Sequence, residues 1–292
     1  MKRAFAIASM FAASVAWGQD VSFKHTEIVD GLYVIEGVGG FGGGNMGLSV
    51  GEDGVVLIDD SVPPLAEKLV AAIAEITDQP VDFVVNTHVH GDHIGANELL
   101  AASGTTVVAH DNIRKRLVEN GIRVGGAQRP APKGMLPVLT FSDAVTFHLN
   151  GHEAYVFHVE RAHTDGDAII HYRSIDVIHS GDVLFNGIFP FIDLDNGGTV
   201  DGFIAAQERI VATAGPDTQI IAGHGPMATR DDVQASIDML KTARSRVAEH
   251  MAAGKSVDEI VAADPLADYE SWNWQFITAE RMVRTIHRSL SE

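Results

Sequence analysis

The stretch Asn86-Thr87-His88-Val89-His90-Gly91-Asp92-His93 decides the fold of this 292-residue chain. Residues 81–85, which precede it, are apolar and largely β-branched, and this predicts a buried strand. Residues 94–102, which follow it, predict a short helix that ends near Gly104. The loop between them can turn tightly at Gly91, so it presents three histidines and one aspartate at the carboxyl end of a strand.

The side chains of this loop suit metal binding, because imidazole nitrogens and carboxylate oxygens are common zinc ligands. His88 and His90, two residues apart on an extended segment, can reach one ion. Asp92 and His93, at the start of the helix, point elsewhere and can reach a second ion. A polar loop with unrelated histidines is the alternative, and the density of ligand residues between positions 88 and 93 disfavours it.

The pattern His-x-His-x-Asp-His after a strand resembles the motif of the metallo-β-lactamase superfamily. The resemblance implies three later ligands, namely a histidine, then an aspartate, cysteine or serine, and then a final histidine. The sequence supplies His163, Asp182 and His224 in this order, and the similarity extends over residues 33–226. The resemblance therefore implies the α/β class and a four-layer αβ/βα sandwich, in which two mixed β-sheets pack together with helices outside.

The same resemblance implies a dinuclear zinc site. The ligands would be His88, His90 and His163 for the first ion, Asp92, His93 and His224 for the second, and Asp182 between the two. The sequence contains no cysteine, so all ligands are nitrogen or oxygen atoms, a set that would also admit manganese or iron. A metal-bridging hydroxide would attack the substrate, with Asp92 as the catalytic residue that orients it.

Two segments are candidates for the substrate pocket. Phe41 lies in the glycine-rich stretch 37–45, which would form either a flap over the substrate or a surface hairpin. Phe185, Ile188, Phe189 and Phe191 follow Asp182, and these residues would either line an apolar pocket or be buried in the domain. Many zinc β-lactamases carry a lysine for the carboxylate of the drug at the position of Phe185, and Asn196 resembles an asparagine of the same enzymes.

Three further positions have supporting or structural interpretations. Asp59, after a predicted strand, would either support the histidine loop from behind or cap a turn. Arg161, beside His163, could supply a cation for a substrate carboxylate. His110 is expected to be structural, with Asp111 capping a helix over residues 112–119.

The composition is that of a globular protein, with 46% hydrophobic and 21% charged residues and a formal net charge of -18. No cluster of basic residues stands out, which argues against nucleic acid as a partner and leaves a small-molecule substrate. The chain is long enough for one domain with an appendage, either as a monomer or as a homodimer.

Residues 1–18 combine Lys2-Arg3, an apolar run and a small-residue end, which predicts a secretory signal cut before Gln19. An uncleaved anchor is the alternative. We therefore expect a periplasmic or secreted protein that does not contact the membrane after cleavage. Residues 19–292 would form the domain, including helices from about residue 231 that pack onto it.

The resemblance leaves the substrate open. The preferred hypothesis is an exported hydrolase of β-lactam-type cyclic amides. The alternative is a thioester, lactone or carboxylic-ester hydrolase of the glyoxalase II-like branch. A non-catalytic metal-binding or redox-relay protein is the hypothesis from a different class. A serine hydrolase is disfavoured, because the sequence has no Gly-x-Ser-x-Gly elbow.

Overall fold

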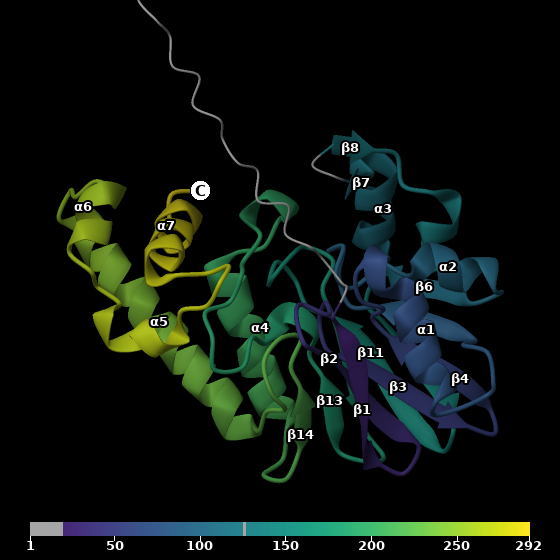
Figure 1. The fold of residues 1–292 in the computed structure, drawn as a ribbon. Coiled ribbons are helices and arrows are strands. Elements are labelled where there is room, and N and C mark those ends of the chain that lie inside the picture. Colours follow the sequence, from purple (N-terminus) through teal and green to yellow (C-terminus); the bar gives the residue numbers. More distant parts are fainter. Residues whose placement is uncertain (1–19, 125–126) are drawn as a thin grey trace, which may run out of the picture.

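A computed structural model describes residues 20–124 and 127–292, and Figure 1 shows two sheets with helices on either side. The predicted signal segment, residues 1–18, lies outside the described residues. The larger sheet has the strand order β1-β2-β3-β4-β5-β6-β9, antiparallel up to β4 and parallel beyond it. Its strands are β1 (Ser22–Val29), β2 (Leu32–Val38), β3 (Met46–Gly51), β4 (Gly54–Ile58), β5 (Phe83–Asn86), β6 (Thr106–His110) and β9 (Leu139–Phe141).

The smaller sheet has the order β10-β11-β12-β13-β14, antiparallel except for its last pair. Its strands are β10 (Ala144–Leu149), β11 (His152–His158), β12 (Ala168–Tyr172), β13 (Val177–His179) and β14 (Gln219–Ile221). A separate two-stranded antiparallel sheet is formed by β7 (Ile122–Val124) and β8 (Ala127–Arg129).

The helices form the outer layers. On one side of the sheets are α1 (Ala66–Ala74), α2 (Asn97–Ala102) and α3 (Asp111–Asn120), and on the other are α4 (Val200–Thr213), α5 (Arg230–Ala252), α6 (Val257–Ala262) and α7 (Ala279–Ser289) (Figure 1). Short 3-10 turns connect several of these elements: η1 (Pro63–Leu65), η2 (Lys133–Met135), η3 (Gly181–Val183), η4 (Leu194–Asn196) and η5 (Ala267–Trp272). Among the described residues, no helix is both long and apolar enough to span a bilayer.

Strand β4 shows why the layers stack in this way. Its side chains alternate between two buried faces, so that Val56 and Ile58 join the core between the sheets, while Val55 and Leu57 join the core under α1. A third core lies between the smaller sheet and helices α4 to α7. The predicted four-layer αβ/βα sandwich is therefore confirmed.

One local prediction about a helix start is wrong. Helix α3 begins at Asp111, and its N-cap is His110, whose Nδ1 accepts the Asn112 N–H at 3.3 Å. His110 also stacks on His158 with ring centroids 3.8 Å apart. Its structural role is thus to join the start of α3 to the end of β11.

Candidate metal centre and substrate cavity

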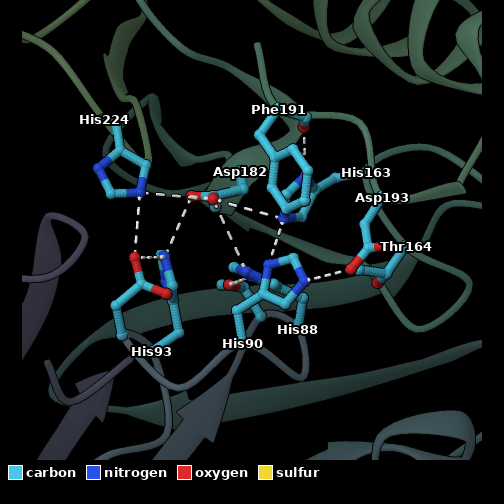
Figure 2. A network of polar contacts seen from close by, with 12 residues as sticks. His88, His90, His93, His163, Thr164, Asp182, Phe191, Asp193 and His224 are labelled. Carbon is cyan, nitrogen blue, oxygen red and sulfur yellow. Dashed lines mark hydrogen bonds and ion pairs between the residues drawn. The ribbon is translucent and has the colours of Figure 1, made fainter. Parts of the chain in front are cut away.

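Four loops at one edge of the sandwich bring the seven predicted ligands together (Figure 2). The loops follow β5, β11, β13 and β14, and they carry His88, His90, Asp92 and His93, then His163, then Asp182, and finally His224. Ligand atoms of His88, His90, His163 and Asp182 lie within 4.8 Å of one another, and so do those of Asp92, His93 and His224. The geometry thus separates the set into the same two groups that the resemblance implied.

Asp182 lies between these groups. One carboxylate oxygen is 3.4 Å from His163 Nε2 and 3.4 Å from His224 Nε2, and the other is 3.2 Å from His93 Nε2. Figure 2 shows the carboxylate at the centre of the histidine rings. Asp182 therefore lies where its carboxylate can bind the ions of both ligand groups.

The donor atoms themselves fit a metal ion. His88 Nε2, His93 Nε2 and Asp182 Oδ1 are buried and make no hydrogen bond with any described residue. Buried polar atoms without a partner are costly and uncommon. Since all three are zinc-ligand atoms that converge on one point, bound ions would supply the missing partners.

The electrostatics favour a cation at this point. Burial lowers the pKa of His88 well below its ordinary value and that of His163 to about 4, so both rings are neutral, as ligands must be. Burial opposes ionisation of Asp92, but the neighbouring His93 outweighs it and lowers the pKa of Asp92 to about 2. Two ionised carboxylates, those of Asp92 and Asp182, therefore face an enclosed centre.

Asp59 lies behind the histidine loop. Its carboxylate accepts hydrogen bonds from the Thr87 N–H and hydroxyl, both at 2.7 Å, and lies 2.7 Å from His93 Nδ1. A carboxylate can only accept, so Nδ1 carries the proton and Nε2 of His93 is free to face Asp182. Asp59 has a φ of 60°, a left-handed conformation that asparagine also tolerates.

Asp59→Asn should weaken binding of the ion held by His93 by about 10–100-fold, because a partner that orients a ligand typically contributes that much. The measurement is zinc affinity by competition with a chromophoric chelator. Asp60→Asn is the matched control, since Asp60 is equally buried but its carboxylate makes no hydrogen bond with a histidine side chain among the described residues. Burial raises the pKa of Asp60 well above its ordinary value, so an amide resembles its neutral form. Equal losses in both variants would contradict the role of Asp59.

Asp193 has a similar position beside the other group, and the sequence interpretation missed it. His90 Nε2 is 2.8 Å from Asp193 Oδ2, which leaves Nδ1 of His90 to face His163 and the centre (Figure 2). His163 Nδ1 in turn donates to the Phe191 carbonyl at 2.6 Å. No local sequence pattern indicates this role of Asp193. The apolar residues before it do not show that its side chain will contact a histidine far away in the chain.

Two glycines allow the loops to approach one another this closely. A Cβ at Gly44 would collide with the His93 ring, and a Cβ at Gly223 would collide with the Asp182 carboxylate. The stretch around Gly44 is also held by backbone bonds from Gly44 N to Asp92 O and from Asn45 N to Gly223 O. The glycine-rich segment is thus joined at its base to two ligand loops.

A cavity of about 400 Å³ opens onto the centre, and its walls are mostly aromatic. Phe41, Phe185 and Phe191, three of the sequence candidates, line it together with His90, Asp92, Asp182 and His224. Phe185 and Phe41 both stack on the His224 ring, with centroids 5.0 and 5.9 Å away. The side chains of the centre therefore form one polar side of a pocket that has several aromatic walls.

Three expected pocket residues do not line this cavity. Phe189 is fully buried and packs near Trp272, and Ile188 packs against the same core. Asn196 lines a neighbouring groove, where its amide donates to Asp193 and its oxygen accepts from Arg116. Along an irregular loop no period determines which apolar residues face inward, so the sequence pattern could not separate Phe189 from Phe191.

The C-terminal segment supplies the rest of the wall. Trp274, Phe276, Ile277 and Arg281, around the start of α7, line the cavity with the predicted residues. From the sequence we expected this region to pack onto the domain and did not place it at the substrate pocket. Even its first cavity residue, Trp274, lies far along the chain from the last ligand, His224. The Trp274 and Phe276 rings lie 5.1 Å apart, and Phe276 lies 5.6 Å from Phe41, so the segment meets the glycine-rich stretch across the cavity.

Comparison with known proteins identifies relatives among hydrolases. A hydroxyacylglutathione hydrolase of Polaromonas sp. (strain JS666) is 27% identical over 167 residues, 56% of each chain. A probable metallo-hydrolase of Bacillus subtilis, YqgX, is 27% identical over 152 residues, 49% of this chain and 68% of the relative. This chain spans 56% and 45% of the length of the two hydroxyacylglutathione hydrolases that it matches.

Solved structures share the fold. A metallo-β-lactamase from Pontibacter korlensis has a TM-score of 0.62 at 19% identity, covering 75% of this chain and 99% of its own. The sec-alkylsulfatase Pisa1 from Pseudomonas sp. has a TM-score of 0.67 at 17% identity, covering 91% of this chain and 50% of its own. The model of the metallo-β-lactamase superfamily matches residues 39–224, a segment that begins at the glycine-rich stretch and ends at His224. This match, over more than half of the chain, shows that the chain belongs to the metallo-β-lactamase superfamily.

Proposed function

We propose that the protein is an exported dinuclear zinc hydrolase that cleaves carboxylic esters, thioesters or lactones with a largely apolar acyl part. The observation that carries the proposal is the cavity with several aromatic walls that opens onto Asp92, Asp182 and the histidines around them. The signal-like residues 1–18 support export to the periplasm or medium. The names of the curated relatives support thioesters, since two of them are hydroxyacylglutathione hydrolases.

The residues that would hold the ions are those of the two groups, with Asp182 shared. His88, His90 and His163 would bind one ion, and Asp92, His93 and His224 the other. When bound, zinc ions supply Lewis acidity toward a carbonyl oxygen and lower the pKa of water, and a set of imidazole and carboxylate ligands also admits manganese or iron.

Asp92 would orient the attacking water. Its Oδ2 lies 3.6 Å from His93 Nε2 and 3.4 Å from His224 Nε2, and the side chain is 22% exposed, so it also faces the cavity. A low pKa keeps this carboxylate ionised, so that it can accept a hydrogen bond from the water and orient it. The aromatic walls exclude bulk water and hold an apolar acyl group by burying it.

The hypothesis of β-lactam hydrolysis has less support from the site. Phe185 is 2% exposed and stacks on His224, at the position where many zinc β-lactamases carry a lysine. Asn196 already uses its amide on Asp193 and Arg116. We therefore expect weak cephalosporin hydrolysis with a high KM.

Phe185→Lys should lower the KM for a cephalosporin by about tenfold or more, since a hydrogen bond to a charged group contributes about 1.5–3 kcal/mol. Phe185→Leu, which keeps the site apolar, is the matched control and should not lower that KM. Steady-state kinetics of the zinc-loaded proteins, with thermal melts to verify folding, provide the test. A KM in the micromolar range for the unsubstituted protein would contradict the apolar-pocket argument.

A hydrolysis screen tests the proposed function itself. The zinc-loaded protein is assayed with a p-nitrophenyl ester, an acyl thioester, a lactone, a cephalosporin and a phosphodiester. The expected order is ester, thioester or lactone above cephalosporin, with the phosphodiester last. Preference for the cephalosporin or phosphodiester would overturn the substrate assignment. Retention of two ions without turnover of any substrate would favour the non-catalytic metal-binding alternative.

A further inference from the structure

We propose that Arg281, on α7, binds a carboxylate that the substrate carries apart from its reacting carbonyl. This inference rests on the proposed function and narrows its substrate class to acyl compounds with a second, anionic end. Four features of the described structure carry it: the position of the guanidinium, its lack of a carboxylate partner, the contacts that hold its segment, and the arrangement of the cavity walls.

Arg281 lines the same cavity as the candidate metal centre. Its guanidinium carbon lies 5.3 Å from the centroid of the Phe191 ring, and Phe191 stacks on His90 with centroids 5.5 Å apart. Arginine stacks well on aromatic faces because its planar cation is weakly hydrated. The guanidinium is thus one aromatic ring away from a predicted metal ligand.

The charge of Arg281 is unmatched, unlike that of the other arginines of α7. Arg284 pairs with Asp258 and Glu280, and Arg288 pairs with Asp195 and Glu292. Within the part of the chain that the structure describes, no carboxylate oxygen lies within 4.0 Å of the Arg281 guanidinium. Its one observed hydrogen bond runs from Nη1 to the Phe276 carbonyl at 2.8 Å. In a chain with a net charge of -18, such a cation at a cavity wall has donors left for a ligand.

Hydrogen bonds hold the segment before α7 against the loop that follows Asp182. The Trp274 indole N–H donates to the Phe189 carbonyl at 2.8 Å, and the Phe189 N–H donates to the Trp272 carbonyl at 2.8 Å. Thr278 caps α7 by accepting the Arg281 N–H at 3.3 Å. These contacts fix the start of α7 relative to the centre, so the guanidinium is placed by packed structure.

The position of Arg281 in the cavity wall indicates which substrates the cavity would bind. A carbonyl next to Asp92 and Asp182 would be joined, along the aromatic walls, to a carboxylate on the Phe191 side. The flat guanidinium fork matches a carboxylate with two parallel hydrogen bonds. Arg161, which the sequence suggested as a cation for a substrate carboxylate, does not line this cavity. The substrate class is therefore an ester, thioester or lactone with an apolar spacer and a terminal carboxylate.

The test compares two esters that differ only in this carboxylate: p-nitrophenyl hexanoate and the mono-p-nitrophenyl ester of adipic acid. The measured quantity is the ratio of kcat/KM for the adipate ester to that for the hexanoate ester. Arg281→Met should lower this ratio by about tenfold or more, chiefly through the KM of the adipate ester, and Arg281→Lys should lower it less. Arg284→Met is the matched control and should leave the ratio unchanged, because Arg284 does not line the cavity and already has two partners.

An unchanged ratio in Arg281→Met, or an equal fall in Arg284→Met, would overturn the inference. If the unsubstituted protein hydrolyses neither ester, the proposed function fails instead. In that case the affinities of adipate and hexanoate for the zinc-loaded protein, measured by calorimetry, decide the inference on their own. A preference for adipate that Arg281→Met removes would support it, and no such preference would overturn it.

Discussion

An Asp92→Asn variant should fold but turn over its best substrate about 100-fold more slowly or worse. The carboxylate of Asp92 lies within 3.4 to 3.6 Å of His224 and His93 and also faces the cavity. Asparagine keeps the shape but removes the negative charge and one acceptor, so the attacking water is no longer held in the orientation for attack. Positioning and proton transfer together commonly contribute on the order of 10²-fold or more.

The measurement is kcat of the zinc-loaded variant, with circular dichroism and metal content determined on the same sample. Asp143→Asn is the matched control, since Asp143 is exposed and its carboxylate contacts only the neighbouring Ser142 among the described residues. That control should turn over at the rate of the unsubstituted protein. Near-normal turnover by Asp92→Asn, with both ions bound, would show that another group orients the water.

The sequence predicts best what depends on neighbouring residues. The run 81–85 and the histidine loop after it lie close together in the chain, so strand, turn and ligand spacing are all visible locally. Helix α5 likewise begins at Arg230, close to residue 231, where the sequence placed the start of the C-terminal helices. The apolar residues 55–58 also form the strand that the sequence places before Asp59, and the structure buries both faces of this strand.

The sequence predicts poorly what depends on distant segments meeting. Trp274 and Arg281 reach the cavity only because hydrogen bonds join their segment to Phe189, which precedes it by more than eighty residues. Asp193 contacts His90 across 103 positions. Hydrophobic periodicity is the main structural signal that a single sequence carries. Neither contact is visible in it, because the segments that meet are irregular.

Removal of the ions should abolish activity and markedly lower the melting temperature. Protein purified without chelator should contain about two ions per chain, since the seven residues form two groups with Asp182 between them. Stripping the ions leaves His88 Nε2, His93 Nε2 and Asp182 Oδ1 buried without partners. At free zinc 1,000-fold above Kd, each site stabilises the folded state by about 4 kcal/mol. In a domain of this size, that corresponds to a fall of roughly 8–16 °C per site on chelation.

The affinity of the protein for zinc should rise with pH. Burial opposes protonation of His224, but Asp182 and Asp92 outweigh it and raise its pKa to about 9, and the same kind of balance raises the pKa of His93 well above its ordinary value. In the ion-free protein both rings are therefore protonated near pH 7, and zinc must displace those protons. Below pH 9, zinc affinity should rise with pH, by up to about tenfold per unit for each proton released.

The folding stability of the ion-free protein should instead fall as pH rises. A histidine pKa that is higher in the folded than in the unfolded state stabilises folding fully below the unfolded value, about 6.5, and this stabilisation is lost as pH rises toward 9. The gap in melting temperature between zinc-loaded and chelated protein should therefore widen from pH 6 to pH 8. Calorimetric melts of both forms across this range, with added zinc restoring the chelated sample, measure the gap directly. A gap that narrows with pH, or one ion or fewer per chain at saturating zinc, would contradict a dinuclear centre built on His93 and His224.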